Sequence, residues 1–179
     1  IYNRLQMAKV TLEALADRRM YRQENLKGAA LERQIQATAK LVGVIRGALV
    51  PNKIDRDPDC PKPEKRWDAF FVVPDQDAVM IITSVGDPDE SSHNGLFLYI
   101  YRHGQAGEDG MVRSEQVVGL QTAKLPSVVD KSEAEWLSRS DPDQLEGLAE
   151  MIETAHPITK EAYTSFMEPK RDLSRISLQ

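Results

Sequence analysis

The chain has 179 residues, and its 23 Lys or Arg against 28 Asp or Glu give a formal net charge of −5. Apolar residues make up 41% of the chain, which suffices for a packed core in one domain, with or without an appendage. This composition excludes a wholly disordered chain, a collagen and a disulfide scaffold. The apolar runs fall far short of the roughly 20 residues that cross a bilayer. We therefore expect a soluble, cytoplasmic protein, unless a membrane helix precedes Ile1.

The charge is divided unevenly along the chain. Residues 1–49 hold nine Lys or Arg against four Asp or Glu, a net charge of +5, whereas residues 50–179 carry a net charge of −10. The sequence therefore predicts a basic segment joined to an acidic domain.

Residues 1–50 predict a basic helical arm, because they contain no proline and repeat apolar residues at helical spacing. One apolar stripe comprises Leu5, Ala8, Leu12 and Leu15, and a second comprises Leu31, Ile35, Val42, Ile45 and Leu49. Gly28 lies between the stripes and predicts a break, giving two helices or one bent helix. Gly43 and Gly47 lie four residues apart and predict close packing of the second stretch on a sheet or a partner helix.

A charged, proline-rich linker is predicted over residues 51–66, since Pro51 ends the helical pattern and no apolar period follows. Beyond it, residues 67–179 predict an acidic α+β domain, which could also be continuous with the arm. Four strands are expected, over residues 67–73, 78–85, 95–101 and within 111–120. Their short connections favour an antiparallel meander over β-α-β units, whose crossovers need a dozen or more residues.

The last third predicts helices with clear start signals. Ser132 and Glu135 form a capping box, and Asp141 followed by proline begins a helix with an apolar stripe. Thr159 caps a last short helix. The fold class is therefore α+β: helical arm, four-stranded meander, then helices packed on the sheet. One face of that sheet is expected to hold the C-terminal helices, and the other the N-terminal helix or a second subunit.

One motif suggests phosphate chemistry. Arg102, His103 and Gly104 follow a hydrophobic strand, and this tripeptide resembles the phosphate-binding signature of the histidine phosphatase superfamily. The resemblance implies His103 as the phosphorylated nucleophile and Arg102 as a phosphate ligand, with imidazole and guanidinium suited to those roles. The alternative interpretation is a turn in which nearby glycines serve backbone geometry.

Other chemistry finds no support in the sequence. Cys60 is the sole cysteine, and the three histidines have no partner at metal-ligand spacing, so we predict neither a metal site nor a cofactor. A nucleotide-binding loop and a nucleophile elbow are also missing from the sequence. We therefore favour a protein that is not an enzyme.

The resulting hypothesis is an interaction, adaptor or chaperone-like module that binds a protein partner or itself as a homo-oligomer, such as a dimer. The order of elements is similar to that of RWD-type domains and bacterial secretion chaperones. The residues expected to bind the partner lie in the arm: Arg18, Arg19, Arg22, Leu31, Ile35, Val42 and Ile45. Nucleic acid is disfavoured because the acidic domain would repel it. The alternatives are the phosphate-handling enzyme and a ligand-sensing domain of a membrane-anchored protein.

Overall fold

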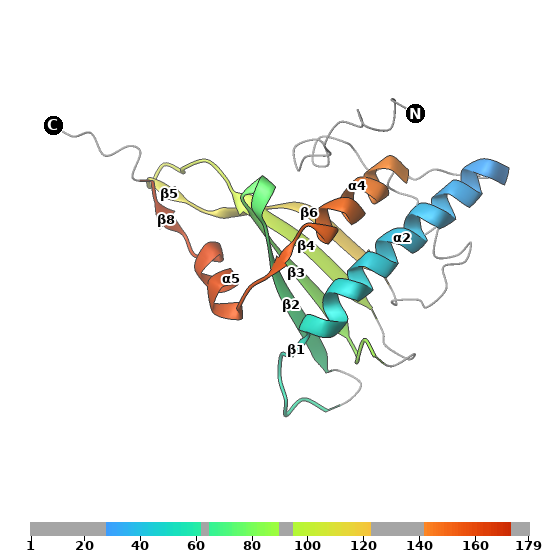
Figure 1. The fold of residues 1–179 in the computed structure, drawn as a ribbon. Coiled ribbons are helices and arrows are strands. Elements are labelled where there is room, and N and C mark those ends of the chain that lie inside the picture. The colour runs from blue at the N-terminus through green and yellow to red at the C-terminus, as the bar shows by residue number, and fades with distance from the viewer. Residues whose placement is uncertain (1–27, 62–64, 90–94, 123–141, 173–179) are drawn as a thin grey trace.

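The computed structural model describes residues 28–61, 65–89, 95–122 and 142–172 (Figure 1). The first apolar stripe of the arm and the capping box at Ser132 lie outside these residues. In chain order the elements are α2 (Gly28–Asn52), β1 (Ile54–Asp55), β2 (Arg66–Val73), a 3₁₀ turn η2 (Pro74–Gln76), β3 (Ala78–Val85), β4 (Leu96–His103), β5 (Met111–Val112), β6 (Ser114–Thr122), α4 (Pro142–Glu153), β7 (His156–Pro157), α5 (Lys160–Met167) and β8 (Lys170–Arg171).

An antiparallel meander forms the centre of the molecule, as predicted. Strands β2, β3, β4 and β6 pair in sequence order, and the short β1 and β7 both pair with β2 on its outer side. The pairing of β4 with β6 shifts by one residue at Ile100 and Tyr101, which is a β-bulge. The α+β class with helices on the sheet is therefore confirmed.

Helix α2 begins and ends where the sequence signals lie. Its first residue, Gly28, has a φ of +56°, a left-handed conformation that glycine adopts without a steric penalty. At the other end Asn52 Nδ2 donates to the carbonyl of Ala48 at 2.8 Å, one residue beyond Pro51. The side that faces the sheet buries Leu41, Ile45 and Leu49 completely.

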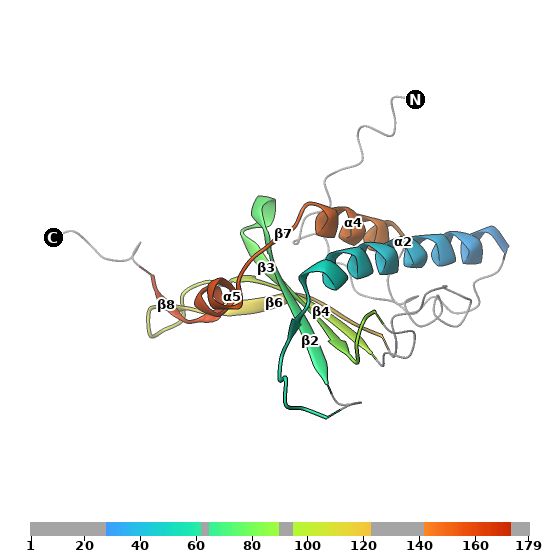
Figure 2. The ribbon, with the colours of Figure 1, turned by 60° about the horizontal axis from the view of Figure 1, so that its bottom comes forward.

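The helices do not divide between the two faces of the sheet as predicted. Helices α2 and α4 lie side by side on one face, where their apolar residues form one core with the strands (Figures 1 and 2). This arrangement buries the apolar residues of both α2 and α4, because the two helices pack against each other as well as against the strands. The short helix α5 lies on the opposite face, and its Tyr163 ring packs against Phe70 of β2 with centroids 4.8 Å apart.

Gly43 and Gly47 do not pack on the sheet, which was one of the two predicted surfaces; packing on a partner helix stays a prediction. Both glycines are exposed, and a Cβ atom added at either would meet nothing within 4 Å. They lie on the side of α2 turned away from the buried Leu41 and Ile45, so packing does not require their small size.

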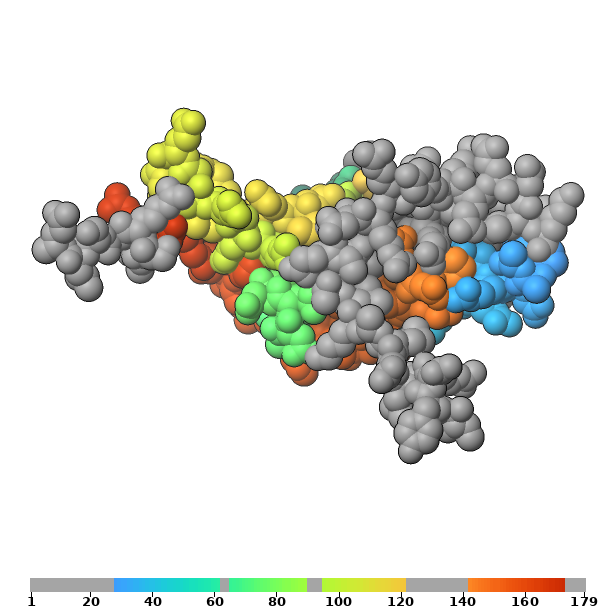
Figure 3. Space-filling model, turned by 90° about the horizontal axis from the view of Figure 1, so that it is seen from above, coloured from blue at the N-terminus to red at the C-terminus, as the bar shows by residue number. Residues whose placement is uncertain are grey.

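A second, two-stranded sheet lies at the end of the molecule opposite α2 and α4. Strand β8 pairs with β5, and α2 and α4 lie together at the other end when the molecule is seen from above (Figure 3). Before β5, Asp109 accepts hydrogen bonds from the Arg113 guanidinium at 2.6 and 3.2 Å and from the Met111 amide at 3.0 Å. These bonds lower the pKa of Asp109 to about 2, with the Arg113 bond as the largest cause.

Candidate functional site

The sequence-predicted phosphate residues line a cleft at the end of β4. The cleft has a volume of about 870 Å³ and lies between the β2–β3 turn, the end of β4 and α5. Its walls are formed by Val72, Pro74, Asp75, Gln76, Asp77, Arg102, His103 and Phe166. The structure therefore brings Arg102 and His103 to one depression in the surface.

Within this cleft His103 is already engaged by the protein. Its Nε2 atom donates a hydrogen bond to the carbonyl of Phe166 at 2.9 Å, and its ring stacks on the Phe166 ring with centroids 4.0 Å apart. Ser114 Oγ donates to the same carbonyl at 3.3 Å. These contacts join the end of α5 to the sheet, which is a structural role for the imidazole.

The charges around the cleft also disfavour a phosphate. Asp75 and Asp77 line it together with Arg102, and the Glu115 side chain lies directly over Gly104. Carboxylates near a bound phosphate repel it, whereas sites that hold phosphate use several donors and cations. The cleft therefore lacks the balance of charge that the phosphatase resemblance requires.

A different candidate is the face of the sheet opposite α2 and α4. We define the open face as the half-buried side chains of Ile81, Phe97, Tyr99 and Tyr101. Antiparallel register places Ile81 directly beside Tyr99, and the three aromatic residues alternate along β4. Their rings follow one another with centroid separations of 6.5 and 6.4 Å, forming a row on one side of the strand.

Helix α5 covers the open face at one side. Beneath it Phe70 and Val79 are buried, whereas the side chains along β4 keep partial exposure. Tyr163 of α5 is sufficiently enclosed that burial, aided by the nearby Tyr101 and Asp68, raises its pKa to about 12. On this side of the sheet, α5 therefore reaches β2 and the His103 end of β4, and Phe97 and Tyr99 stay half-buried beyond it.

Two polar groups border the open face and are satisfied within the protein. Asp68 is buried and accepts hydrogen bonds from the Arg56 guanidinium at 2.6 and 2.7 Å and from Thr83 Oγ1 at 2.7 Å. On the β6 side, Gln121 Nε2 donates to the Tyr99 hydroxyl at 2.8 Å. The charge of Asp68 is thus neutralised by Arg56, and the Tyr99 hydroxyl has a donor in Gln121.

The arm residues predicted to bind a partner fall into three groups. Arg18, Arg19 and Arg22 lie outside the described residues. Val42 and Ile45 are 6% and 0% exposed and belong to the core shared with the sheet and α4. Leu31 and Ile35 are half-buried near the start of α2.

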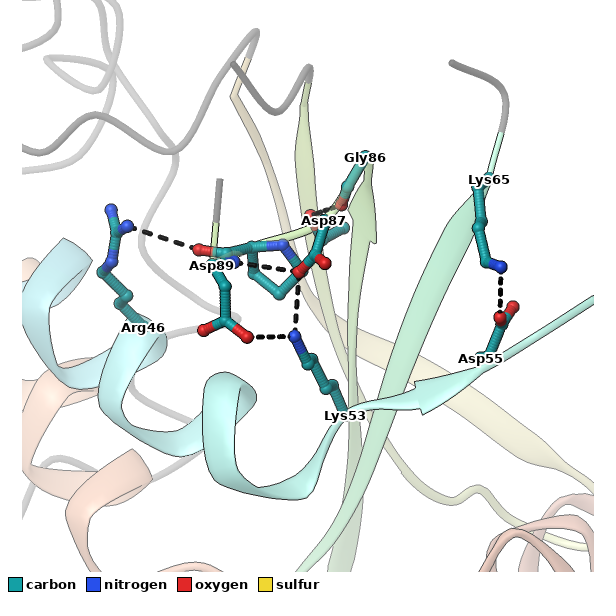
Figure 4. A network of polar contacts seen from close by, with 9 residues as sticks. Arg46, Lys53, Asp55, Lys65, Gly86, Asp87 and Asp89 are labelled. Atoms are coloured by element: carbon teal, nitrogen blue, oxygen red, sulfur yellow. Dashed lines mark hydrogen bonds and ion pairs between the residues drawn. The ribbon is translucent and has the colours of Figure 1, made fainter. Parts of the chain in front are cut away.

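Several basic residues of α2 and the following segment bind acidic or carbonyl groups of the same chain. Arg33 pairs with Asp143 of α4, and Arg46 donates to the Pro88 carbonyl at 3.3 Å. Lys53 binds both Asp87, at 2.8 Å, and Asp89 in the loop after β3 (Figure 4). Burial alone would lower the pKa of Lys53, but these two carboxylates outweigh it and raise the pKa.

Lys65 has the same kind of neighbours as Lys53. Lys53 and Lys65 both approach the ring of Trp67, at 5.0 and 5.4 Å from its centre, and Lys65 pairs with Asp55 at 2.6 Å. Each lysine therefore already has a carboxylate partner. Lys53 ties the end of α2 to the β3–β4 loop, and Lys65 ties the segment before β2 to β1.

The sequence predicted the strands that form the open face, but not which side of the sheet would stay partly exposed. Leu96, Leu98 and Ile100 alternate with the aromatic residues of β4, so the pattern predicts a strand that is apolar on both sides. Which side α5 covers depends on packing between residues about 90 positions apart, for which no local signal exists.

Comparison with known proteins returns no relative. No protein-family model matches the chain, and neither curated proteins nor solved structures match it. In the described part of the chain, none of the helices is long and apolar enough to span a membrane. Among the same residues, side chains of His, Cys, Asp and Glu do not gather into a metal-binding group.

Proposed function

We propose that this protein is a non-enzymatic interaction module that binds another protein on the open face of its sheet. The observation that carries the proposal is the row formed by Phe97, Tyr99 and Tyr101, which is half-buried and, among the described helices, bordered by α5. Aromatic side chains are enriched at protein interfaces, because they bury a large area at a small cost in side-chain entropy.

The chemistry of the face indicates the kind of partner. The nearest buried charge, Asp68, is matched by Arg56 within the protein, and the tyrosine hydroxyls supply polar groups at the surface. A charged partner surface would lose hydration here without gaining a counter-charge. We therefore infer a partner that presents aliphatic side chains, with hydrogen-bonding groups at their border.

The described part of the arm lies outside the proposed contact on the open face. Leu31 and Ile35 are half-buried on α2, across the sheet from the open face, and Val42 and Ile45 belong to the core. The phosphate-handling alternative is not favoured, because His103 binds Phe166 and two carboxylates, Asp75 and Asp77, line the cleft.

Affinity capture with matched variants tests the proposal. The wild-type protein, the double variant Phe97→Gln/Tyr99→Gln and the control Ala39→Gln are immobilised and exposed to lysate of the source organism. Ala39 is exposed on α2, so its replacement leaves the open face unchanged. Each bound protein is quantified by mass spectrometry, and each candidate partner is then purified and titrated directly.

The expected result is a protein retained by the wild type and the control but lost from the double variant. Removal of interface aromatics costs about 2 kcal/mol or more, which corresponds to a roughly thirtyfold weaker Kd in the direct titration. Equal capture by all three proteins would refute the assignment of the open face.

A further inference from the structure

The two edges of the main sheet differ in how they are protected. On the β2 side, β1 and β7 occupy the outer edge, and the Phe70 carbonyl accepts a hydrogen bond from the Ile158 amide at 2.9 Å. On the other side β6 is the last strand, and no described strand pairs with its outer edge. Strand β6 spans nine residues, so about half of its backbone groups point away from β4.

Apart from the bulge, the sequence of β6 lacks the usual protections of an edge strand. Its sequence, Ser-Glu-Gln-Val-Val-Gly-Leu-Gln-Thr, contains neither proline nor lysine, and Glu115 is its one charged residue. Proline, lysine, short length and β-bulges are among the features by which proteins prevent further strand pairing. The bulge disturbs the ladder near Gln116 and Val117, but residues 118–122 pair regularly with β4.

We propose that this edge pairs antiparallel with β6 of a second copy of the chain, about a two-fold axis that passes near Leu120. In this register Leu120 faces Leu120 of the second copy, and Gly119 faces Gln121. All five paired residues, Val118 to Thr122, are uncharged, so the symmetric arrangement brings no like charges together. Glu115 lies beyond the paired stretch in both copies.

The proposed pairing also suits the two faces of the sheet. A two-fold axis normal to the sheet keeps α2 and α4 of both copies on one side and the open faces on the other. The Leu120 side chain, 8% exposed and on the core side, would gain an apolar neighbour from the second copy. The two open faces would become one continuous surface, although the pairing does not depend on what binds there.

Hydrogen exchange combined with analytical ultracentrifugation tests this proposal on the full chain. Both measurements are made on the wild-type protein over a series of concentrations. At a concentration far above the dimer Kd, the outward-facing amides of β6 should exchange on the order of tenfold more slowly than in the monomer. The amides of β2 should show no dependence on concentration, which makes that strand an internal control.

A cross-linking experiment then tests the register. In a Cys60→Ser background, Gln121→Cys should give a covalent dimer with a short bismaleimide, because the two Cβ atoms lie about 7–8 Å apart in this register. The matched control is Lys40→Cys in the same background, at an exposed position on α2, which should give no dimer.

The remaining outcomes each overturn the proposal. These are a monomer at every concentration, or a dimer whose β6 amides exchange independently of concentration. Protection of β6 in the monomer would assign the edge to another segment of the same chain, such as residues 123–141. None of these outcomes affects capture of a partner on the open face, so the two proposals fail separately.

Discussion

His103 offers the sharpest separation between a structural and a catalytic role. Replacement by alanine removes the hydrogen bond from Nε2 to the Phe166 carbonyl, worth about 1 kcal/mol. It also removes the ring stack at 4.0 Å, worth about 0.5–1.5 kcal/mol. Because Ser114 still donates to the same carbonyl, that oxygen is not left without a donor. We therefore expect His103→Ala to lower the free energy of unfolding by about 1.5–2.5 kcal/mol.

Urea denaturation followed by circular dichroism measures this loss. His103→Gln should recover part of it, since an amide can donate to the carbonyl but cannot stack in the same way. The control is His156→Ala at an exposed position, expected to change stability by less than about 0.5 kcal/mol. A phosphate-ester assay is run on the same samples. Turnover by the wild type that disappears in His103→Ala without loss of stability would refute the structural role.

Further predictions concern the core and two titrating groups. Ile45→Ala should lower the free energy of unfolding, measured by urea denaturation, by about 2–5 kcal/mol, because Ile45 is fully buried. Gly43→Ala should raise it by about 0.5–1 kcal/mol, because the added Cβ meets open space. A stability loss in Gly43→Ala would mean that this glycine is packed after all. Burial raises the pKa of Tyr163 from 10.0 to about 12, so its contribution to stability is complete below pH 10 and is lost as the pH rises through about 12. The free energy of unfolding should therefore fall between about pH 10 and pH 12, and Tyr163→Phe should abolish this fall. The same fall in Tyr163→Phe would contradict the assignment to Tyr163. The pKa of Asp109 is lowered from 3.8 to about 2, so its contribution is present above pH 3.8 and is lost as the pH falls through about 2. The Met111 amide shift in NMR spectra should report that titration, and a midpoint near 3.8 would contradict the ion pair.

The local elements were accessible from the sequence because their signals are local. Gly28 predicted a helix boundary and stands at the first residue of α2, and Thr159 caps α5 by accepting a hydrogen bond from the Ala162 amide at 3.1 Å. The strand predicted over residues 78–85 coincides with β3. Backbone conformation at such positions depends on the residue and its near neighbours, so composition and spacing suffice.

The short strands were beyond prediction for the opposite reason. Strands β1, β7 and β8 have two residues each, and β1 lies inside the segment predicted as a linker. Two residues show no period, and each pair is held in place by a neighbouring strand. The same limit applies to His103, whose role depends on Phe166, 63 residues further along the chain.

By itself the sequence determined the α+β class, the order of the elements and the apolar character of β4 on both sides. Only the tertiary structure decided that α2 and α4 share one face, that α5 binds part of the other, and that β6 is the last of the described strands in the sheet. The physical reason is that an apolar stripe predicts which residues will be buried, but not which surface they will pack against. That choice is made by competition among all the apolar surfaces of the chain for the same neighbours.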